Sequence, residues 1–131
     1  AAKAADGIWF FTPEYNHFFP GVLKNLIDWL SLPAGKERPV LIGKPAAISG
    51  TTTGMHAPAC AQDALVTLIS YINMDVMNAP RLTIPYILEQ VDEGGRVTLT
   101  KSRKYLERQA DAFLAFVRKR VEDAEREAAK A

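Results

Sequence analysis

The sequence predicts a domain of the α/β class with a parallel sheet. Three short segments of mostly apolar or small residues each lead, through a loop, to a segment with helical spacing of its apolar residues. Strand, loop and helix repeated in this order are typical of right-handed βαβ units. The chain has 131 residues, the length of one ordinary domain. Only about three strands fit in it, whereas open doubly wound sheets have roughly five or six, so we expect an incomplete sheet.

The first predicted strand covers residues 7–12 and is ended by Pro13. Its aromatic and branched residues favour a strand that is buried on both faces, so we assign the three aromatic residues at 9–11 to the core. Residues 13–20 contain two prolines and an asparagine. This composition predicts a shaped loop rather than a regular element.

A helix is predicted over residues 21–30. Pro20 suits the first turn of this helix, and the apolar residues that follow form one stripe. Residues 33–45, rich in proline, glycine and charge, predict an exposed connection. The second strand is expected at 45–49, and the loop of small residues at 50–54 follows it.

The second half of the chain predicts a helix, a strand and a long terminal helix. Pro58 suits the start of the helix, whose apolar periodicity continues to residue 72. The third strand is expected at 76–84, where Pro80 indicates an irregular or edge segment. A turn at 92–96 precedes the terminal helix, predicted from about residue 100 to 127.

Composition and charge exclude several classes of protein. No apolar run approaches the ~18 residues that a membrane span needs. The formal net charge of +1 lacks the excess that nucleic-acid binding requires. Cys60 is the single cysteine, so it forms no internal disulfide and supplies no Cys-rich metal cage. We expect no metal site, no membrane or nucleic-acid partner, and a cytoplasmic location, which a lone cysteine permits.

Two predicted loops lie where open α/β sheets bind ligands, beyond the carboxyl ends of the strands. Residues 13–16 offer a flat ring, an acceptor carboxylate, and an amide that both donates and accepts. Residues 50–54 offer three hydroxyls and unhindered backbone N–H groups before a helix N-terminus, a position that favours a partial negative charge on a ligand. Together these loops can hold a planar heterocycle with polar edges.

An ordered run of residues resembles a known family. Thr12-Pro13-Glu14-Tyr15-Asn16, followed by residues 20–25 and Asp28-Trp29, is similar to the signature of the NADPH-dependent FMN reductases. This flavodoxin-like family includes quinone, chromate and azo-dye reductases. The similarity continues along three later segments, namely residues 43–45, 50–54 and 92–97.

The resemblance implies a flavodoxin-like three-layer sandwich, with residues 1–131 as one partial domain and 101–131 as its C-terminal helix. It implies FMN as the cofactor, NADPH or NADH as the hydride source, and quinone-like acceptors. The flavin carries the hydride chemistry, so no catalytic side chain is implied. A homodimer or homotetramer is also implied. The implied flavin-binding residues are Pro13, Glu14, Tyr15, Asn16, Thr51, Thr52, Thr53 and Gly54.

The chain departs from the family at its beginning. Members of the family begin with a strand and a Gly/Ser-rich loop that wraps the FMN phosphate, whereas residues 1–6 resemble the last turn of a helix. We therefore expect the N-terminal βαβ unit to be absent and the chain alone to bind FMN poorly. Two rival hypotheses follow: a non-catalytic fragment that serves as a dimerisation or interaction module, and an FMN electron carrier without NADPH turnover. A separate chain that supplies the missing strands is a further hypothesis.

Several candidate residues also have a purely structural interpretation. Tyr15 can pack its ring and use its hydroxyl in a hydrogen bond. Glu14 can cap a helix or pair with Lys24, and Asn16 can satisfy the backbone of a turn.

His17 and His56 each follow a predicted binding loop and can contact a nicotinamide or an acceptor, but exposed histidines without a task are commoner. Neither is assigned a role in proton transfer. Cys60 is interpreted as a small buried residue.

Overall fold

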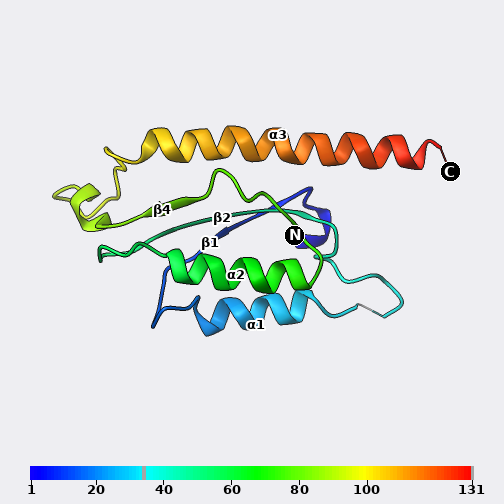
Figure 1. Ribbon diagram of the computed structural model, residues 1–131, viewed down its shortest axis with the longest axis horizontal. Coiled ribbons are helices and arrows are strands. Elements are labelled where there is room, and N and C mark those ends of the chain that lie inside the picture. The colour runs from blue at the N-terminus through cyan, green and yellow to red at the C-terminus, as the bar shows by residue number, and fades with distance from the viewer. Residues whose placement is uncertain (34, 131) are drawn as a thin grey trace.

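The computed structural model describes residues 1–33 and 35–130. A four-stranded sheet lies between two helices on one face and one helix on the other, which makes three layers (Figure 1). The strands are β1 (Ile8–Phe11), β2 (Pro45–Thr51), β3 (Asp75–Val76) and β4 (Leu82–Ile84). The helices are α1 (Gly21–Leu30), α2 (Ala59–Tyr71) and α3 (Arg103–Ala128), with short 3₁₀ helices at Ala2–Ala4 and Ile87–Gln90.

Strand β2 is the centre of the sheet. It pairs with β1 along one edge and with both β3 and β4 along the other, and every pairing is parallel. In the register, Phe11 lies beside Ser49, and Ser49 lies beside Leu82. The carboxyl ends of β1, β2 and β4 therefore meet at one edge of the sheet.

The prediction of one strand over residues 76–84 is wrong, because the structure has two short strands there. β3 ends at Val76, and β4 begins at Leu82. Between them, Met77 still donates its N–H to the carbonyl of Ala46 at 2.8 Å. Pro80 has no N–H to contribute to a ladder, so the chain leaves the sheet around it. The Ala79–Pro80 peptide bond is cis.

The other predicted elements agree with the structure. The helix expected at 21–30 is α1, with Pro20 as its N-cap, and the helix expected after Pro58 is α2. The second strand, β2, extends two residues beyond the predicted end at 49. Residues 92–96 form a turn between Val91 and Val97, which pair as an antiparallel bridge.

Helix α3 occupies the C-terminal segment predicted to be helical. It starts at Arg103 rather than about residue 100 and ends at Ala128. Position 131, which the predicted segment 101–131 includes, lies outside the described residues. Residues 1–6 hold a single 3₁₀ turn, Ala2–Ala4. Over the described part of the chain, no helix is both long and apolar enough to cross a membrane.

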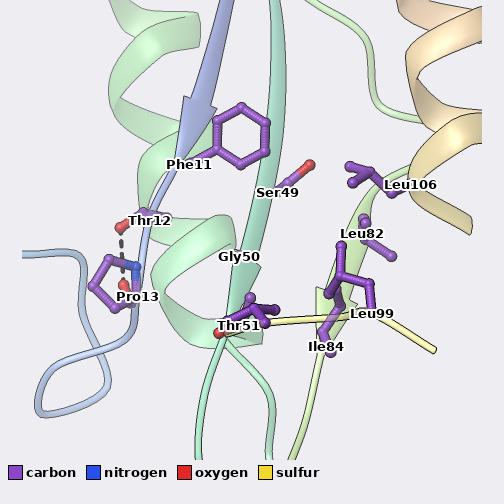
Figure 2. Close-up of a pocket in the computed structure, with 11 residues that line it drawn as sticks. Phe11, Thr12, Pro13, Ser49, Gly50, Thr51, Leu82, Ile84, Leu99 and Leu106 are labelled. Carbon is purple, nitrogen blue, oxygen red and sulfur yellow. Dashed lines mark hydrogen bonds between the residues drawn. The ribbon is translucent and has the colours of Figure 1, made fainter. Parts of the chain in front are cut away.

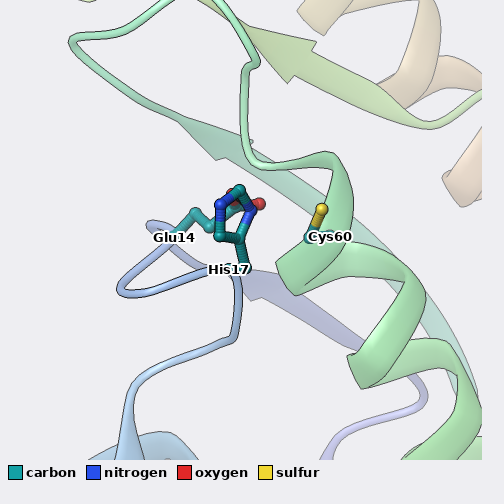
Figure 3. Close-up of side chains that lie close together, drawn as sticks. All are labelled: Glu14, His17 and Cys60. Atoms are coloured by element: carbon teal, nitrogen blue, oxygen red, sulfur yellow. Dashed lines mark ion pairs between the residues drawn. The ribbon is translucent and has the colours of Figure 1, made fainter.

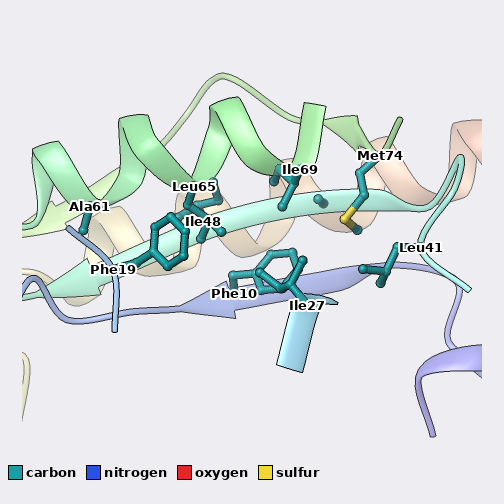
Figure 4. Close-up of a cluster of buried hydrophobic side chains, with 10 residues drawn as sticks. Phe10, Phe19, Ile27, Leu41, Ile48, Ala61, Leu65, Ile69 and Met74 are labelled. Carbon is teal, nitrogen blue, oxygen red and sulfur yellow. The ribbon is translucent and has the colours of Figure 1, made fainter. Parts of the chain in front are cut away.

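The main hydrophobic core lies between the sheet and helices α1 and α2 (Figure 4). Ile48 of β2 and Leu65 and Ile69 of α2 are almost fully buried in it. Full burial of such a side chain contributes about 1.5–3 kcal/mol. The core residues are Phe10, Phe19, Ile27, Leu41, Ala46, Ile48, Ala61, Leu65, Ile69 and Met74.

The face of the sheet that α3 covers has a smaller apolar cluster, formed by Ala47, Met77 and Phe113. Trp9 packs against Phe113 with ring centroids 5.8 Å apart. The prediction that Phe11 belongs to the core is wrong, because this residue is 62% exposed. Successive side chains of a strand point to opposite faces, so Phe10 enters the main core while Phe11 lies on the α3 side.

The far half of α3 is attached to the sheet by an ion pair. The Arg120 guanidinium donates a hydrogen bond to the Asp75 carboxylate of β3 and also lies 4.8 Å from the Phe116 ring centroid. The hydrogen bond and then the charge of Asp75 raise the pKa of Arg120 above its ordinary value. This ion pair holds the C-terminal half of α3 against β3.

Candidate functional site

A cavity of about 340 Å³ lies at the carboxyl ends of β1, β2 and β4 (Figure 2). Its volume falls within the range of roughly 300–1,000 Å³ that is usual for small-molecule sites. Its walls are mostly apolar and come from the three strand ends, residues 97–99 and the start of α3. The lining residues are Phe11, Thr12, Pro13, Ser49, Gly50, Thr51, Leu82, Ile84, Val97, Leu99 and Leu106.

The wall between β1 and β2 requires a glycine. A Cβ atom added to Gly50 would overlap the carbonyl oxygen of Thr12 and approach the Pro58 ring to 2.8 Å. Next to it, the Thr12 N–H donates to the carbonyl of Ser49 at 2.9 Å. The absence of a side chain at Gly50 lets the two strand ends approach this closely, which shapes the cavity.

The loop after β2 is held in place by hydrogen bonds that its carbonyl groups accept. Ile87 N–H donates to the Thr52 carbonyl at 3.0 Å, and Tyr86 N–H donates to the Gly54 carbonyl at 3.3 Å. The Thr52 hydroxyl also donates to the Gly54 carbonyl, at 3.0 Å. Among residues 1–33 and 35–130, no acceptor pairs with the N–H of Thr53 or Gly54. These two donors remain available to a ligand.

Residues 15–18 form a small hairpin in the loop after β1, with a two-residue turn at its tip. Tyr15 and Phe18 exchange backbone hydrogen bonds of 2.8 and 3.0 Å. Asn16 and His17 both have positive φ angles, 52° and 60°, as the centre of a type I′ turn requires. Asparagine and histidine are among the residues that adopt such angles most readily. Within the described chain, the Asn16 side chain makes no hydrogen bond to the turn, so the turn-satisfying interpretation finds no support.

Glu14 caps the N-terminus of helix α2, although it lies 47 residues before Ala61 in the sequence. Its side chain is 9% exposed, and its Oε2 accepts the backbone N–H of Ala61 at 2.9 Å. An anion at a helix N-terminus is stabilised by the unpaired N–H groups and the helix dipole. The capping interpretation of Glu14 is therefore confirmed. Lys24 pairs instead with Asp28, at 2.7 Å.

Cys60 lies in the first turn of α2, close to Glu14 and His17 (Figure 3). The prediction that it is buried is wrong, because Cys60 is exposed. The buried positions at the start of α2 are instead taken by the next two residues, Ala61 and Gln62. His56, the other histidine, is exposed in the preceding loop.

A buried polar network lies behind the cavity wall. Ser49 Oγ accepts from Trp9 Nε1 at 2.8 Å and donates to Gln109 Oε1 at 2.5 Å. Gln109 Nε2 donates to the carbonyls of Ile48 and Pro80. Gln109 is fully buried, and its three partners are Ser49 and Ile48 of β2 and Pro80, which lies just before β4.

Sequence reasoning missed this network, although a signal for it exists. Gln109 is three residues after Leu106 and four before Phe113, which places a polar side chain on the apolar stripe of the last helix. A polar residue in such a position is usually hydrogen-bonded.

Of the eight predicted flavin-binding residues, Pro13 and Thr51 line the cavity. Glu14 instead binds the N-terminus of α2, and Tyr15 and Asn16 are exposed on the hairpin. Thr52, Thr53 and Gly54 form the loop that continues from Thr51 at the cavity edge. The assignment of these residues to a flavin stays a prediction.

A parallel sheet between two helical layers, with a ligand-sized cavity at the carboxyl ends of its strands, defines a flavodoxin-like α/β protein. The fold class predicted from the sequence is confirmed. The chain belongs to the family described as NADPH-dependent FMN reductase, which residues 1–89 match.

Named relatives agree with this family. The chain is 41% identical over 116 residues to a 2-hydroxy-1,4-benzoquinone reductase from Burkholderia sp., covering 88% of this chain and 62% of the relative. It is 38% identical over 117 residues to an NAD(P)H-dependent FMN reductase from Pseudomonas aeruginosa, covering 89% and 62%.

A solved structure shows the same likeness in three dimensions. FerB from Paracoccus denitrificans, a flavoenzyme NAD(P)H:(acceptor) oxidoreductase, superposes with a TM-score of 0.75 and is 34% identical. The match covers 91% of this chain and 64% of FerB. The chain thus spans less than two thirds of the length of these relatives.

The residues present fit the ring of the flavin that the family name implies. An isoalloxazine ring is flat and largely apolar, with carbonyl and nitrogen groups along one edge. The cavity supplies apolar walls from Phe11, Leu82 and Leu106, and the loop beside it supplies the free N–H groups of Thr53 and Gly54. This pairing of apolar walls and a few polar groups is usual for cofactor sites.

Proposed function

We propose that the protein is an FMN-dependent oxidoreductase that uses NADPH or NADH to reduce small acceptors such as quinones. The proposal draws on family membership, and on relatives that are named as quinone and FMN reductases. The structural observation that carries it is the apolar cavity beside a loop with free backbone donors.

When bound, FMN would supply the hydride chemistry between NAD(P)H and the acceptor. Pro13 and Thr51 would contribute to the wall that holds the ring. The N–H groups of Thr53 and Gly54 donate to the polar edge of the ring. Donors that are already fixed in place stabilise negative charge on that edge without reorganising.

We also propose that the protein works as a homodimer or homotetramer in the cytoplasm, where NAD(P)H is regenerated. The support for self-association is the outer surface of α1, where Val22, Leu26 and Trp29 are exposed. An exposed apolar patch of this kind is typical of an interface. Equilibrium sedimentation of the purified chain tests the oligomer.

The first experiment is an absorbance and fluorescence titration of the purified chain with FMN, with its intact mass recorded. Weak but saturable one-to-one binding is expected, and absence of saturation would contradict the proposal. A parallel titration with riboflavin measures how much the phosphate group of FMN contributes to binding.

The second experiment tests whether the backbone N–H of Gly54 contributes to FMN binding. Gly54→Pro removes one free N–H, whereas Gly54→Ala keeps it and meets no atom within 4 Å of the new Cβ. Loss of one such hydrogen bond should weaken FMN binding by about tenfold. Equal affinities for the two variants would contradict the role of the N–H.

The third experiment is NADPH and NADH oxidation by the FMN-loaded chain with benzoquinone as the acceptor. Turnover is expected with quinone present. FMN binding without turnover would favour the electron carrier, and failure to bind FMN would favour the non-catalytic module.

A further inference from the structure

We propose that Glu14, His17 and Cys60 form a binding site for a zinc ion at the N-terminus of α2 (Figure 3). These residues bring a carboxylate oxygen, an imidazole nitrogen and a thiol sulfur together from two separate elements. The site does not depend on the proposed function, because none of its three residues lines the cavity.

The three ligand groups are already close to a coordinating arrangement. One ligand atom from each residue lies within 4.8 Å of the others, and Glu14 Oε1 is 3.6 Å from His17 Nδ1. With bonds of about 2.0–2.3 Å to a tetrahedral zinc, two ligand atoms are separated by about 3.3–3.8 Å. The His17 side chain is 79% exposed and Cys60 is exposed, so rotation of these two side chains can close the remaining gap.

The carboxylate is held in place before any ion binds. Glu14 Oε2 accepts the N–H of Ala61 at 2.9 Å, while its other oxygen, Oε1, lies on the His17 side. Carboxylates that bind metals are typically oriented by such a second hydrogen bond. Cys60 immediately precedes Ala61, so the residue that orients Glu14 also fixes the backbone next to the thiol.

The imidazole is held on the hairpin. His17 occupies the second central position of the type I′ turn, and the Tyr15–Phe18 backbone hydrogen bonds close that turn. The backbone of His17 is therefore fixed by the turn, and only its side chain remains free to rotate. An ion bound by all three residues would link the hairpin to helix α2.

The donor set selects zinc among common divalent ions. Magnesium and calcium prefer oxygen ligands, whereas zinc binds imidazole, thiolate and carboxylate together. A carboxylate and a thiolate also balance the two positive charges of the ion. Three protein ligands leave the fourth position of a tetrahedral zinc to water or another small ligand.

The test is a titration of the reduced, flavin-free 131-residue chain with Co²⁺, which reports its coordination by absorbance. We expect one ion per chain, visible bands typical of four-coordinate Co²⁺, and a near-ultraviolet charge-transfer band from a bound thiolate. Added Zn²⁺ should displace Co²⁺ and remove both signals. Absence of saturable binding, or visible bands without the thiolate band, would overturn the proposal.

Three conservative variants assign the ligands. Cys60→Ser should abolish the thiolate band, and His17→Asn, which keeps a residue tolerant of positive φ, should weaken Zn²⁺ binding at least about tenfold. Glu14→Gln keeps an acceptor for the Ala61 N–H but removes the anionic oxygen, and should weaken binding similarly.

The matched control is His56→Asn, which removes the only other histidine. It should bind Zn²⁺ like the parent chain. Equal loss in this variant, or a thiolate band that survives Cys60→Ser, would overturn the assignment. Far-ultraviolet circular dichroism of each variant confirms that the comparison is between folded proteins.

Discussion

The two faces of the sheet are built from different kinds of side chain. On the face covered by α1 and α2, the core is mainly apolar, and Ile48, Leu65 and Ile69 are excluded from solvent. The buried polar side chain of α2, Gln62, makes one hydrogen bond to the sheet, to the Leu82 carbonyl. On the face covered by α3, a small apolar cluster adjoins a buried glutamine, Gln109, that hydrogen-bonds across the sheet. The cavity opens on this second side, between Phe11 and Leu106.

This difference shows how one sheet serves both stability and ligand binding. Close apolar packing on one face stabilises the fold, because large side chains are removed from water there. The other face leaves the strand ends partly uncovered and keeps them in position through directional hydrogen bonds. A change in the first face should therefore alter stability most, and a change at the cavity should alter binding most.

The largest effect is expected for Leu65→Ala in the main core. The lost apolar contacts and the cavity left behind should lower the free energy of unfolding by about 2–5 kcal/mol. Leu114→Ala, on the exposed side of α3, is the matched control and should change it by about 0.5 kcal/mol or less. Urea unfolding followed by circular dichroism gives both values. If both variants lost a similar free energy of unfolding, the main core would not be the stabilising face of the sheet.

The next effect is expected for Gln109→Leu on the opposite face. This change leaves the Ser49 hydroxyl and the carbonyls of Ile48 and Pro80 without their partner, at a cost of about 1–3 kcal/mol. Gln62→Leu is the comparison, because Gln62 is equally buried but makes one such bond, to the Leu82 carbonyl. A larger loss for Gln62→Leu would contradict the role given to the network.

A smaller effect is expected for Glu14→Ala at the N-terminus of α2. Loss of the cap should lower the free energy of unfolding by about 0.5–2 kcal/mol. Glu14→Gln should lose less, since the amide oxygen still accepts the Ala61 N–H. Thermal unfolding with a metal chelator present isolates capping from any bound ion. Equal losses would show that charge, rather than the hydrogen bond, stabilises the helix end.

The smallest effect on stability is expected for Phe11→Ala, although its effect on binding should be clear. Phe11 stacks on Trp9 with ring centroids 5.0 Å apart, so its loss should cost roughly 0.5–1.5 kcal/mol. FMN binding should weaken several-fold, because Phe11 forms part of the cavity wall. Tyr71→Ala, an exposed aromatic residue of α2 away from the cavity, should bind FMN like the parent chain. Unchanged affinity for Phe11→Ala would exclude this wall from the flavin site.

Local features of the sequence predicted much of the framework. The prolines at 20 and 58 correctly mark the starts of α1 and α2, and apolar spacing predicted the course of both helices. The fold class followed from the order of strands and helices. These features depend on residues that are neighbours along the chain, so they can be read from it directly.

Contacts between distant residues escaped prediction. The sequence predicts that Phe11 and Cys60 are buried, yet both are exposed, because burial depends on which element covers each position. The division of the third strand depends on how residues 77–81 meet β2 around Pro80.

The sequence by itself therefore determined the alternation of strands and helices, the starts of α1 and α2, and the two loops beside the strand ends. Only the tertiary structure decided which side chains meet. Glu14 and Ala61 are 47 residues apart, and Ser49 and Gln109 are 60 apart, yet each pair is hydrogen-bonded. Such pairs form because strand register and helix placement bring remote segments together, and no periodicity along the chain encodes that geometry.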